Sequence, residues 1–265
     1  MTTNLQKTLI LITSFTAILG LLFTQNQNLD SFNIAPEKVG KKEVISSNSR
    51  TNSVKNTSSF NANPKPAIPS KESFAVVELF TSQGCSSCPP ADRVLRDIID
   101  EAAKTGKQVY GLSFHVDYWN YLGWKDPYSH ADYSNRQRYY NQRLKSRGSY
   151  TPQMIVNGVS EFVGSKRKYA NQEVSYALET PAKVEIAITN LQLDKNKNQV
   201  EVEYQITGDC KNCKVNIAAV ESNLNDAVKR GENHGRTLQH DNVVRAFKTK
   251  SFEASDKMKI HLPNG

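Results

Sequence analysis

The sequence predicts an α/β domain followed by a smaller antiparallel β domain. Between residues 74 and 180, continuous apolar runs typical of buried strands alternate with segments of helical period. After residue 181 the apolar residues recur with a period of two, which is typical of antiparallel strands. Before both lies an apolar run and a long polar stretch. We therefore divide the chain into a signal peptide or signal anchor, a disordered linker, an α/β domain and an antiparallel, sandwich-like β domain, at residues 1–24, 25–73, 74–180 and 181–265.

The N-terminal segment has the pattern of an export signal. Lys7 precedes an apolar run over residues 8–24, and no further charge appears before Asp30. A small-x-small cleavage site is not obvious after Phe23, and the run is close to the lower limit of about 17 residues for a membrane span. We therefore expect a periplasmic or secreted protein, either released or anchored to the inner membrane by this hydrophobic helix.

The linker and the charge distribution limit the classes of partner. Residues 25–73 are rich in Asn, Ser, Lys and Pro, and cannot bury enough apolar surface to offset their chain entropy. Of the net charge of +8, half falls within residues 1–72, so the folded part is only mildly basic. We expect a flexible tether, no nucleic-acid partner, and membrane contact only through the N-terminal segment.

A cysteine pair follows the first strand of the α/β domain. Residues 74–80 are almost continuously apolar, which suits a central strand covered on both faces. Cys85 and Cys88 come next, and apolar residues then recur at helical spacing at Val94, Leu95, Ile98, Ile99 and Ala102. The prolines after Cys88 are tolerated in a first helical turn, and Asp92 suits its positive end. Cys85 is therefore expected in a strand-to-helix turn.

This position suits thiol chemistry. Two cysteines three residues apart on a first helical turn have Cα atoms roughly 5–6 Å apart, a distance that a disulfide can bridge. The helix N-terminus favours thiolate at Cys85, which we expect to be accessible and able to attack, while Cys88 resolves the mixed disulfide. The pair predicts a thiol–disulfide oxidoreductase that needs no cofactor. A structural disulfide and half of a zinc site are the alternatives.

The sequence after the first helix predicts the remaining strands and helices of the α/β domain. We expect a buried strand, a helix, a short strand, a returning strand and a closing helix, at residues 109–117, 131–145, 154–156, 159–163 and 166–178. Asn157-Gly158 is a typical two-residue hairpin turn between the last two strands. The order strand–helix–strand–helix–strand–strand–helix is that of a thioredoxin fold.

Several motifs together resemble a known family. The signature segments lie at residues 78–92, 113–119, 123–127, 150–153 and 230–245. They are similar to those of a bacterial family of exported thioredoxin-like proteins that is catalogued as a domain of unknown function. The resemblance covers residues 74–250 and implies a thioredoxin fold and thiol chemistry. It also implies that Pro152 follows a cis bond and faces the thiol pair, with Thr151 beside it. Protein thiols or disulfides and a redox partner are then the expected partners.

Glu78 is a candidate general base. It lies seven residues before Cys85, and thioredoxins carry a buried acid one residue closer to the thiol pair. A carboxyl group desolvated in an apolar strand is suited to take up a proton. The alternative is a structural carboxylate held by hydrogen bonds.

His115, Asp117 and Trp119 are candidate binding residues. His115 and Asp117 share one face near the C-terminal end of their strand, where ligands gather in open α/β sheets. Imidazole and thiolate also suit Cu(I), so a copper-handling or zinc-handling protein is an alternative function, although we assign no metal site. His115 can instead hold the loop over residues 118–127. Trp119 in that loop is either part of a peptide-binding wall or packs the loop down.

The second domain carries another cysteine pair and a polar segment. Cys210 and Cys213 can form a local disulfide, bind zinc together with the first pair, or exchange electrons with it. The polar segment contains His234, Arg236 and His240. We expect these side chains either to reach the thiol site or to hold the two domains together. A last strand at residues 258–262 is followed by turn residues, so we expect the sequence to lack a final strand.

Overall fold

The protein is described by a computed structural model. The described residues are 7–14, 17–19, 73–208, 210 and 213–263. They belong to one compact unit. The predicted linker, apart from Ser73, lies outside the described residues. The final residues 264–265 of the expected C-terminal turn lie outside them as well.

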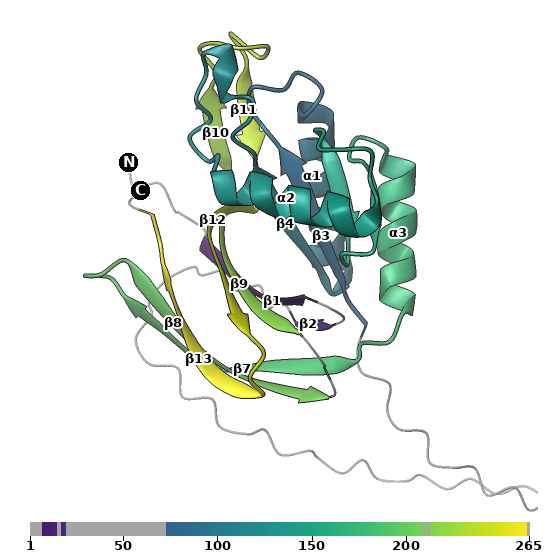
Figure 1. Cartoon of the computed structure of the whole chain (residues 1–265), viewed down its shortest axis with the longest axis vertical. Coiled ribbons are helices and arrows are strands. Elements are labelled where there is room, and N and C mark those ends of the chain that lie inside the picture. Colours follow the sequence, from purple (N-terminus) through teal and green to yellow (C-terminus); the bar gives the residue numbers. More distant parts are fainter. Residues whose placement is uncertain (1–6, 15–16, 20–72, 209, 211–212, 264–265) are drawn as a thin grey trace, which may run out of the picture. The chain divides into compact units, whose positions relative to one another are not determined.

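The centre of the fold is a mixed sheet of eight strands in the order β2-β1-β9-β12-β4-β3-β5-β6 (Figure 1). Strands β3 and β4 are parallel neighbours, while β5 is antiparallel to β3 and β6 is antiparallel to β5. These four strands span Ala75–Thr81, Val109–His115, Gln153–Val156 and Ser160–Val163. The expected Asn157-Gly158 turn joins β5 to β6, and both of its residues have positive φ.

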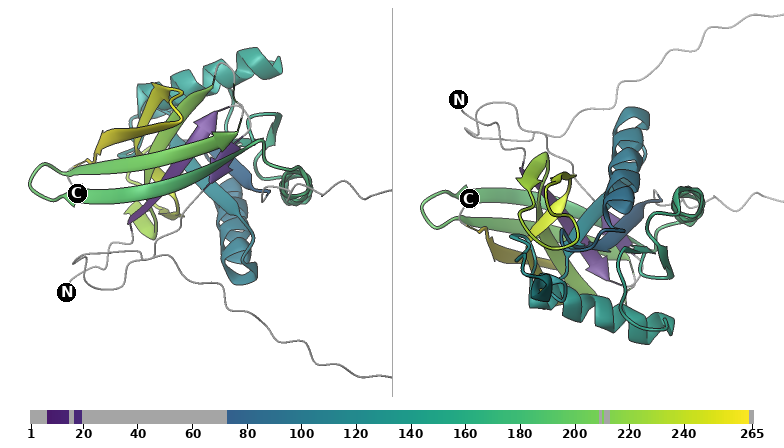
Figure 2. Two further views of the ribbon diagram at one scale, coloured as in Figure 1. Left: turned by 90° about the horizontal axis from the view of Figure 1, so that it is seen from below. Right: turned by 90° about the horizontal axis from the view of Figure 1, so that it is seen from above.

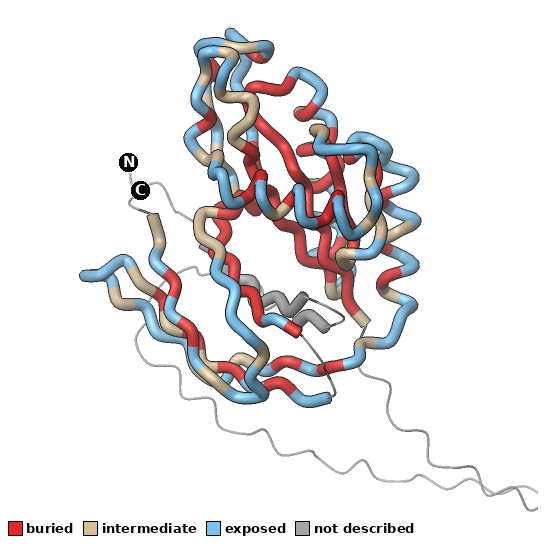
Figure 3. The backbone as a smooth tube through the Cα atoms, in the orientation of Figure 1, coloured by how far each residue is buried: buried red, intermediate tan, exposed pale blue. Residues whose placement is uncertain are grey.

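The α-helices of the described residues lie at the three predicted positions. They are α1, α2 and α3, at Pro89–Thr105, Ala131–Leu144 and Arg167–Glu179. A short 3₁₀ helix, η1, spans Asn120–Leu122. Residues of α1 and α3 pack on one face of the sheet, and α2 packs on the other (Figure 2). Every residue of β3 and β4 is buried, as their continuous hydrophobicity requires (Figure 3).

The sheet does not stop at the predicted domain boundary. Strands β9 (Lys214–Glu221) and β12 (Val243–Ser251) come from the second predicted domain but continue the main sheet beside β4. Asn242 makes the junction, because its carbonyl accepts from the Ser113 N–H at 2.8 Å and its side chain donates to the Gly111 carbonyl at 3.1 Å. The structure therefore adds two strands to the α/β sheet that the sequence assigned to a separate domain.

The remaining strands form two small antiparallel sheets. One has the order β13-β8-β7, with strands at Ser255–His261, Gln199–Gly208 and Val184–Asp194. Its apolar face packs on one face of β9, through residues such as Ile217, while Ala218 of β9 faces the α2 core. The other is the hairpin of β10 (Leu224–Ala227) and β11 (Thr237–His240), which the sequence did not predict.

The N-terminal segment, predicted as a signal or anchor helix, contains strands where it is described. Strand β1 (Lys7–Ser14) pairs with β9 along its whole length, and β2 (Ala17–Leu19) pairs with β1. Pairing with β9 gives these backbone groups partners that a helix would have supplied internally. The other residues of this segment lie outside the described part, so its role as an export signal stays a prediction. None of the described helices is long and apolar enough to cross a membrane.

Candidate thiol site

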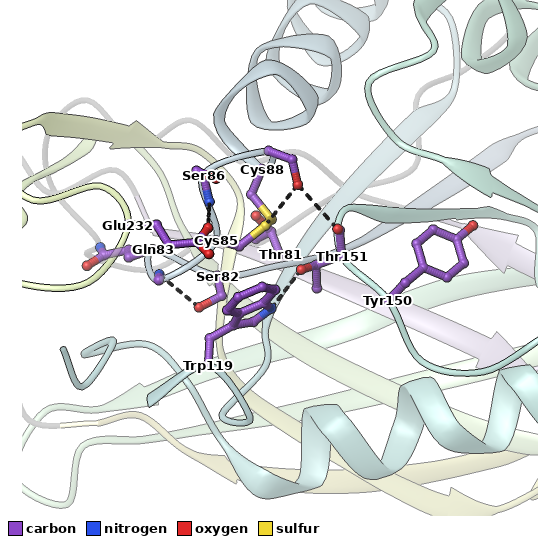
Figure 4. The surroundings of a disulfide bond; sticks show 12 residues. Thr81, Ser82, Gln83, Cys85, Ser86, Cys88, Trp119, Tyr150, Thr151 and Glu232 are labelled. Atoms are coloured by element: carbon purple, nitrogen blue, oxygen red, sulfur yellow. Dashed lines mark hydrogen bonds between the residues drawn. A yellow bond between two sulfur atoms is a disulfide. The ribbon is translucent and has the colours of Figure 1, made fainter. Parts of the chain in front are cut away.

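The cysteine pair lies in the predicted strand-to-helix turn (Figure 4). Cys85 and Cys88 form a disulfide with a Cα–Cα distance of 5.5 Å, and Cys88 directly precedes the first residue of α1. The Cys88 N–H donates to the Cys85 carbonyl at 3.2 Å. The turn is therefore held by a backbone hydrogen bond as well as by the disulfide. The geometry matches the separation that the three-residue spacing predicted.

The expectation that Cys85 is accessible is wrong. Both cysteines are 0% exposed, although Ser86 and Ser87 between them are exposed. The main chain of the turn is covered from one side by Trp119, since a Cβ added to Gly84 would lie 3.0 Å from the Trp119 Cβ. Residues from the loop between β10 and β11 cover it further. The disulfide is therefore closed off in this conformation.

The cis proline lies beside the disulfide, as the resemblance implied. Thr151-Pro152 is a cis peptide bond. Ser87 connects it to the cysteine, because its hydroxyl lies 3.3 Å from the Cys85 Sγ and donates to the Thr151 carbonyl at 3.5 Å. Trp119 donates from Nε1 to the Thr151 hydroxyl at 2.8 Å. Four predicted site residues, Cys85, Thr151, Pro152 and Trp119, thus meet at one place.

His115 holds the loop after β4, which was the structural alternative for this residue. It is fully buried, and its Nδ1 lies 2.7 Å from the Asp126 Oδ2. The same carboxylate oxygen accepts from the Gln83 N–H at 2.8 Å, so one acid fixes both the loop and the turn before Cys85. Burial works against a charged imidazole, but the Asp126 charge and hydrogen bond raise the pKa of His115 above its ordinary value. The pKa of Asp126 is held below its ordinary value by His115, against the opposing effect of burial.

A second acid, Asp92, lies behind the thiol pair on α1. It is four residues after Cys88, and helical side chains at this spacing lie on one face and point toward the N-terminus. Its Oδ1 accepts from the Thr81 hydroxyl at 2.9 Å, and its Oδ2 lies 3.9 Å from the Nδ1 of His240. Burial raises the pKa of Asp92 to about 6. Burial also lowers the pKa of His240 to about 3, so this imidazole is neutral.

Glu78 lies on the other face of the sheet from α1. On β3, Val77 and Leu79 face the core beneath α1, whereas Val76 and Phe80 face the core beneath α2. Because side chains alternate along a strand, Glu78 points to the α2 side.

There Glu78 is fully engaged in an ion pair. Arg136 donates to it from Nε at 2.6 Å and from Nη2 at 2.8 Å, and the Tyr140 hydroxyl donates at 2.6 Å. These groups line a cavity of about 910 Å³ beneath α2. The geometry favours the structural carboxylate over the general base for Glu78.

Asp117 is turned toward the start of α2. Its Oδ1 accepts from the Ser134 hydroxyl at 2.5 Å, and its backbone N–H donates to the Ser134 Oγ at 3.2 Å. It therefore fixes the chain entering α2, and its hydrogen bonds go to Ser134 rather than to the thiol pair. Among the described residues, no group of three or more His, Cys, Asp and Glu side chains is arranged to hold a metal ion.

The second cysteine pair forms a local disulfide. Cys210 and Cys213 form a disulfide between β8 and β9, with a Cα–Cα distance of 5.8 Å. Of the three alternatives for this pair, the local disulfide is the one present in the structure.

The polar segment does reach the thiol turn, but through Glu232 and Asn233, which lie in a signature segment and were given no role from the sequence. Glu232 accepts from the Ser86 N–H at 2.8 Å, and Asn233 donates from Nδ2 to the carbonyls of Gln83 and Cys85, each at 2.9 Å. Of the expected side chains, His234 is exposed, while Arg236 donates to Asn233 at 3.0 Å and positions it. His240 reaches Asp92 instead. The density of Gly, Asn and charged residues in this segment was the signal that a site lay here.

Fold and site together define a class: a mixed α/β domain whose disulfide lies before a helix and beside a cis proline. The chain belongs to the family described as a protein of unknown function, DUF1223, whose model matches residues 76–265. A solved structure, protein AGR_C_4864 from Agrobacterium tumefaciens, is similar, with 33% identity over 73% of this chain and 80% of that chain, and a TM-score of 0.53. HBP35 of Porphyromonas gingivalis has 16% identity over 72% of this chain and 64% of that chain, and a TM-score of 0.49. A search of curated proteins gives no match.

Proposed function

We propose that this chain is an exported, thioredoxin-like thiol–disulfide exchange protein that acts through Cys85 and Cys88 on protein thiols or disulfides. The observation that carries the proposal is the disulfide at the start of α1, linked through Ser87 to the cis Thr151-Pro152 bond. The strand order β4-β3-β5-β6, with α1 between the two parallel strands, supports the thioredoxin-like assignment. Export is supported by the apolar run after Lys7.

The chemistry that we propose exchanges two electrons. In the reduced protein, the Cys85 thiolate attacks one sulfur of a partner disulfide, whose S–S bond breaks and releases a partner thiolate. The Cys88 thiol then gives its proton to a base and attacks the Cys85 sulfur. The second partner sulfur leaves as a thiolate, the partner is reduced, and the Cys85–Cys88 bond is formed. The same steps in reverse oxidise a partner dithiol.

Asp92, not Glu78, is suited to be the base for Cys88. It is buried on the face of α1 that carries Cys88, and its pKa of about 6 lets it both accept and return a proton near neutral pH. Thr81 orients the carboxylate through one oxygen, which leaves the other toward His240. Glu78 is excluded from this role by its position on the opposite sheet face.

An insulin-reduction assay tests the proposal. The chain is reduced beforehand and freed of reductant, so that the assay does not depend on how fast a small dithiol reaches the Cys85–Cys88 bond. The reduced wild type is then expected to reduce insulin disulfides, and Cys85→Ser is expected to abolish this reaction. Cys88→Ser is expected to retain the first attack and to accumulate a mixed disulfide, which mass spectrometry detects. The matched control is Cys210→Ser/Cys213→Ser, which removes the other pair. Reduced wild type that leaves the insulin disulfides intact would remove the oxidoreductase proposal.

A second candidate is a binding module in which the disulfide is a fixed bridge. The complete burial of both cysteines is the observation that favours it. Copper or zinc handling is a third use of the same pair, and metal content after anaerobic purification of the reduced protein separates it from exchange. Equilibration with glutathione buffers separates the first two, because a fixed structural disulfide resists reduction by the glutathione pool.

A further inference from the structure

The thiol turn is covered by a short segment from the far end of the sequence. Residues 229–236, which we call the strap, connect β10 to β11 and lie against the turn. A Cβ added to Gly231 would lie 4.0 Å from the Gly84 Cα and 3.6 Å from the Trp124 Cβ. The strap therefore packs on the residues just before Cys85 and on the loop that follows β4.

The strap is attached to main-chain groups of the turn. Glu232 accepts from the Ser86 N–H, while the Asn233 amide donates to the carbonyls of Gln83 and Cys85. One N–H and two carbonyls on either side of a reactive cysteine are the groups that an extended polypeptide pairs with. The strap thus occupies, from within the same chain, the main-chain positions that a polypeptide partner needs.

The strap has fewer buried residues than the β10–β11 hairpin that carries it. Asn233 is 0% exposed, but most other strap residues are exposed, so lifting the strap uncovers little apolar surface. The hairpin itself is fixed to α1, because Arg96 donates to Asp241 and, at 3.0 Å, to the Gln239 carbonyl, and His240 is buried. The strap can therefore open while β10 and β11 stay in place.

We propose that the strap is an autoinhibitory cover of the Cys85–Cys88 site, and that a polypeptide partner gains access by taking over the main-chain contacts of Glu232 and Asn233. The inference rests on the proposed exchange function. It predicts that small reductants meet a closed disulfide and that partners are proteins with an extended segment. Ser86 and Ser87 are exposed and mark the side from which such a segment arrives.

The experiment measures how fast dithiothreitol reduces the Cys85–Cys88 bond in the full chain. Free thiols are alkylated at timed intervals, and mass mapping of peptides reports the two disulfides separately. The folded wild type is expected to react at least about 100-fold more slowly than the same chain unfolded in urea. Asn233→Ala removes two hydrogen bonds that hold the strap closed, and is expected to raise the folded rate about tenfold.

Two further variants keep the test independent of folding defects. Glu232→Ala removes only the exposed contact to Ser86, and is expected to raise the rate several-fold, by less than Asn233→Ala. Asn225→Ala on β10 makes the same chemical change at an exposed position of the same hairpin, and is expected to leave the rate unchanged. Circular dichroism before the reaction identifies any variant that does not fold.

The proposal that the strap covers the disulfide is refuted if the folded wild type reacts as fast as the unfolded chain. It is also refuted if Asn233→Ala and Glu232→Ala fold but react no faster than Asn225→Ala. The proposed function can fail separately. Strap variants that react faster with dithiothreitol, but do not exchange with a protein disulfide in the insulin assay, support the cover and refute the exchange function.

Discussion

Asp92 provides a test in which stability and activity are expected to change in opposite directions. The carboxyl group lies behind the thiol pair with 9% of its residue surface exposed, and burial raises its pKa from 3.8 to about 6. Ionisation of this group is therefore less favourable in the folded protein than in the unfolded chain. At pH 7 the difference corresponds to about 3 kcal/mol of lost stability.

Asp92→Asn removes this cost. The sign follows from the raised pKa: well below pH 3.8 the carboxyl group is neutral in both states and there is no penalty, and the penalty grows as the pH rises from there until it passes 6. The amide oxygen can still accept from Thr81, so the substitution keeps the observed hydrogen bond. We expect the variant to be up to about 3 kcal/mol more stable at pH 7, with most of the gain lost near pH 4.

Urea denaturation of the oxidised protein from pH 4 to pH 8 measures this gain. Asp97→Asn is the matched control, because Asp97 lies on the same helix but is half-exposed and paired with Arg167 at the surface. Its effect is expected to stay within about 1 kcal/mol at every pH. In the insulin assay, Asp92→Asn is expected to slow exchange by about 100-fold, as the loss of a proton acceptor does. A gain in stability that does not depend on pH, or undiminished exchange, would contradict the assignment.

The other predictions concern groups around the site. Arg136→Ala leaves Glu78 buried without its cation and is expected to lower the free energy of unfolding by about 3–5 kcal/mol, measured in urea. If Glu78→Gln slows insulin reduction in protein that remains folded, the structural assignment of Glu78 is wrong. His240→Gln is expected to reduce acid sensitivity: the lowered pKa of His240 adds stability above pH 6.5 that is lost as the pH falls toward 3, and thermal melts between these limits report it. Asp126→Asn replaces one of two accepting oxygens by an NH2 donor, so that either His115 and Gln83 or the Tyr128 N–H loses its acceptor, and it removes the charge beside His115. It is expected to destabilise the protein by about 2 kcal/mol or more, with unchanged melting as the contrary result.

The local elements around the thiol pair follow from short-range sequence patterns. The run before Thr81 is apolar except at Glu78, so it forms a strand buried on both faces, and the helical spacing after Cys88 forms α1. Asn157-Gly158 accepts positive φ at both positions, which makes the β5–β6 hairpin predictable. Such features depend on a few neighbouring residues and need no knowledge of the rest of the chain.

The site beyond the two cysteines depends on residues far apart in the sequence. Asn233 reaches the Cys85 carbonyl across 148 positions, and Asp126 reaches Gln83 across 43. The sequence left Glu78 open between a base and a structural carboxylate for a related reason. Its spacing from Cys85 says how far along the strand it lies, but its partner Arg136 comes from α2. Periodicity gives the face of an element and not the group that packs against it.

Contiguous residues encode the order of the central elements, the two cysteine pairs with two residues inside each pair, and the family resemblance, so all three could be predicted before the fold was known. Three features came from the folded arrangement instead: strands from the C-terminal half complete the main sheet, Asp92 is the buried acid behind Cys88, and the disulfide is covered. Each of these depends on which surfaces meet when the chain closes on itself. Burial and ionisation are properties of that closed arrangement and of no single segment.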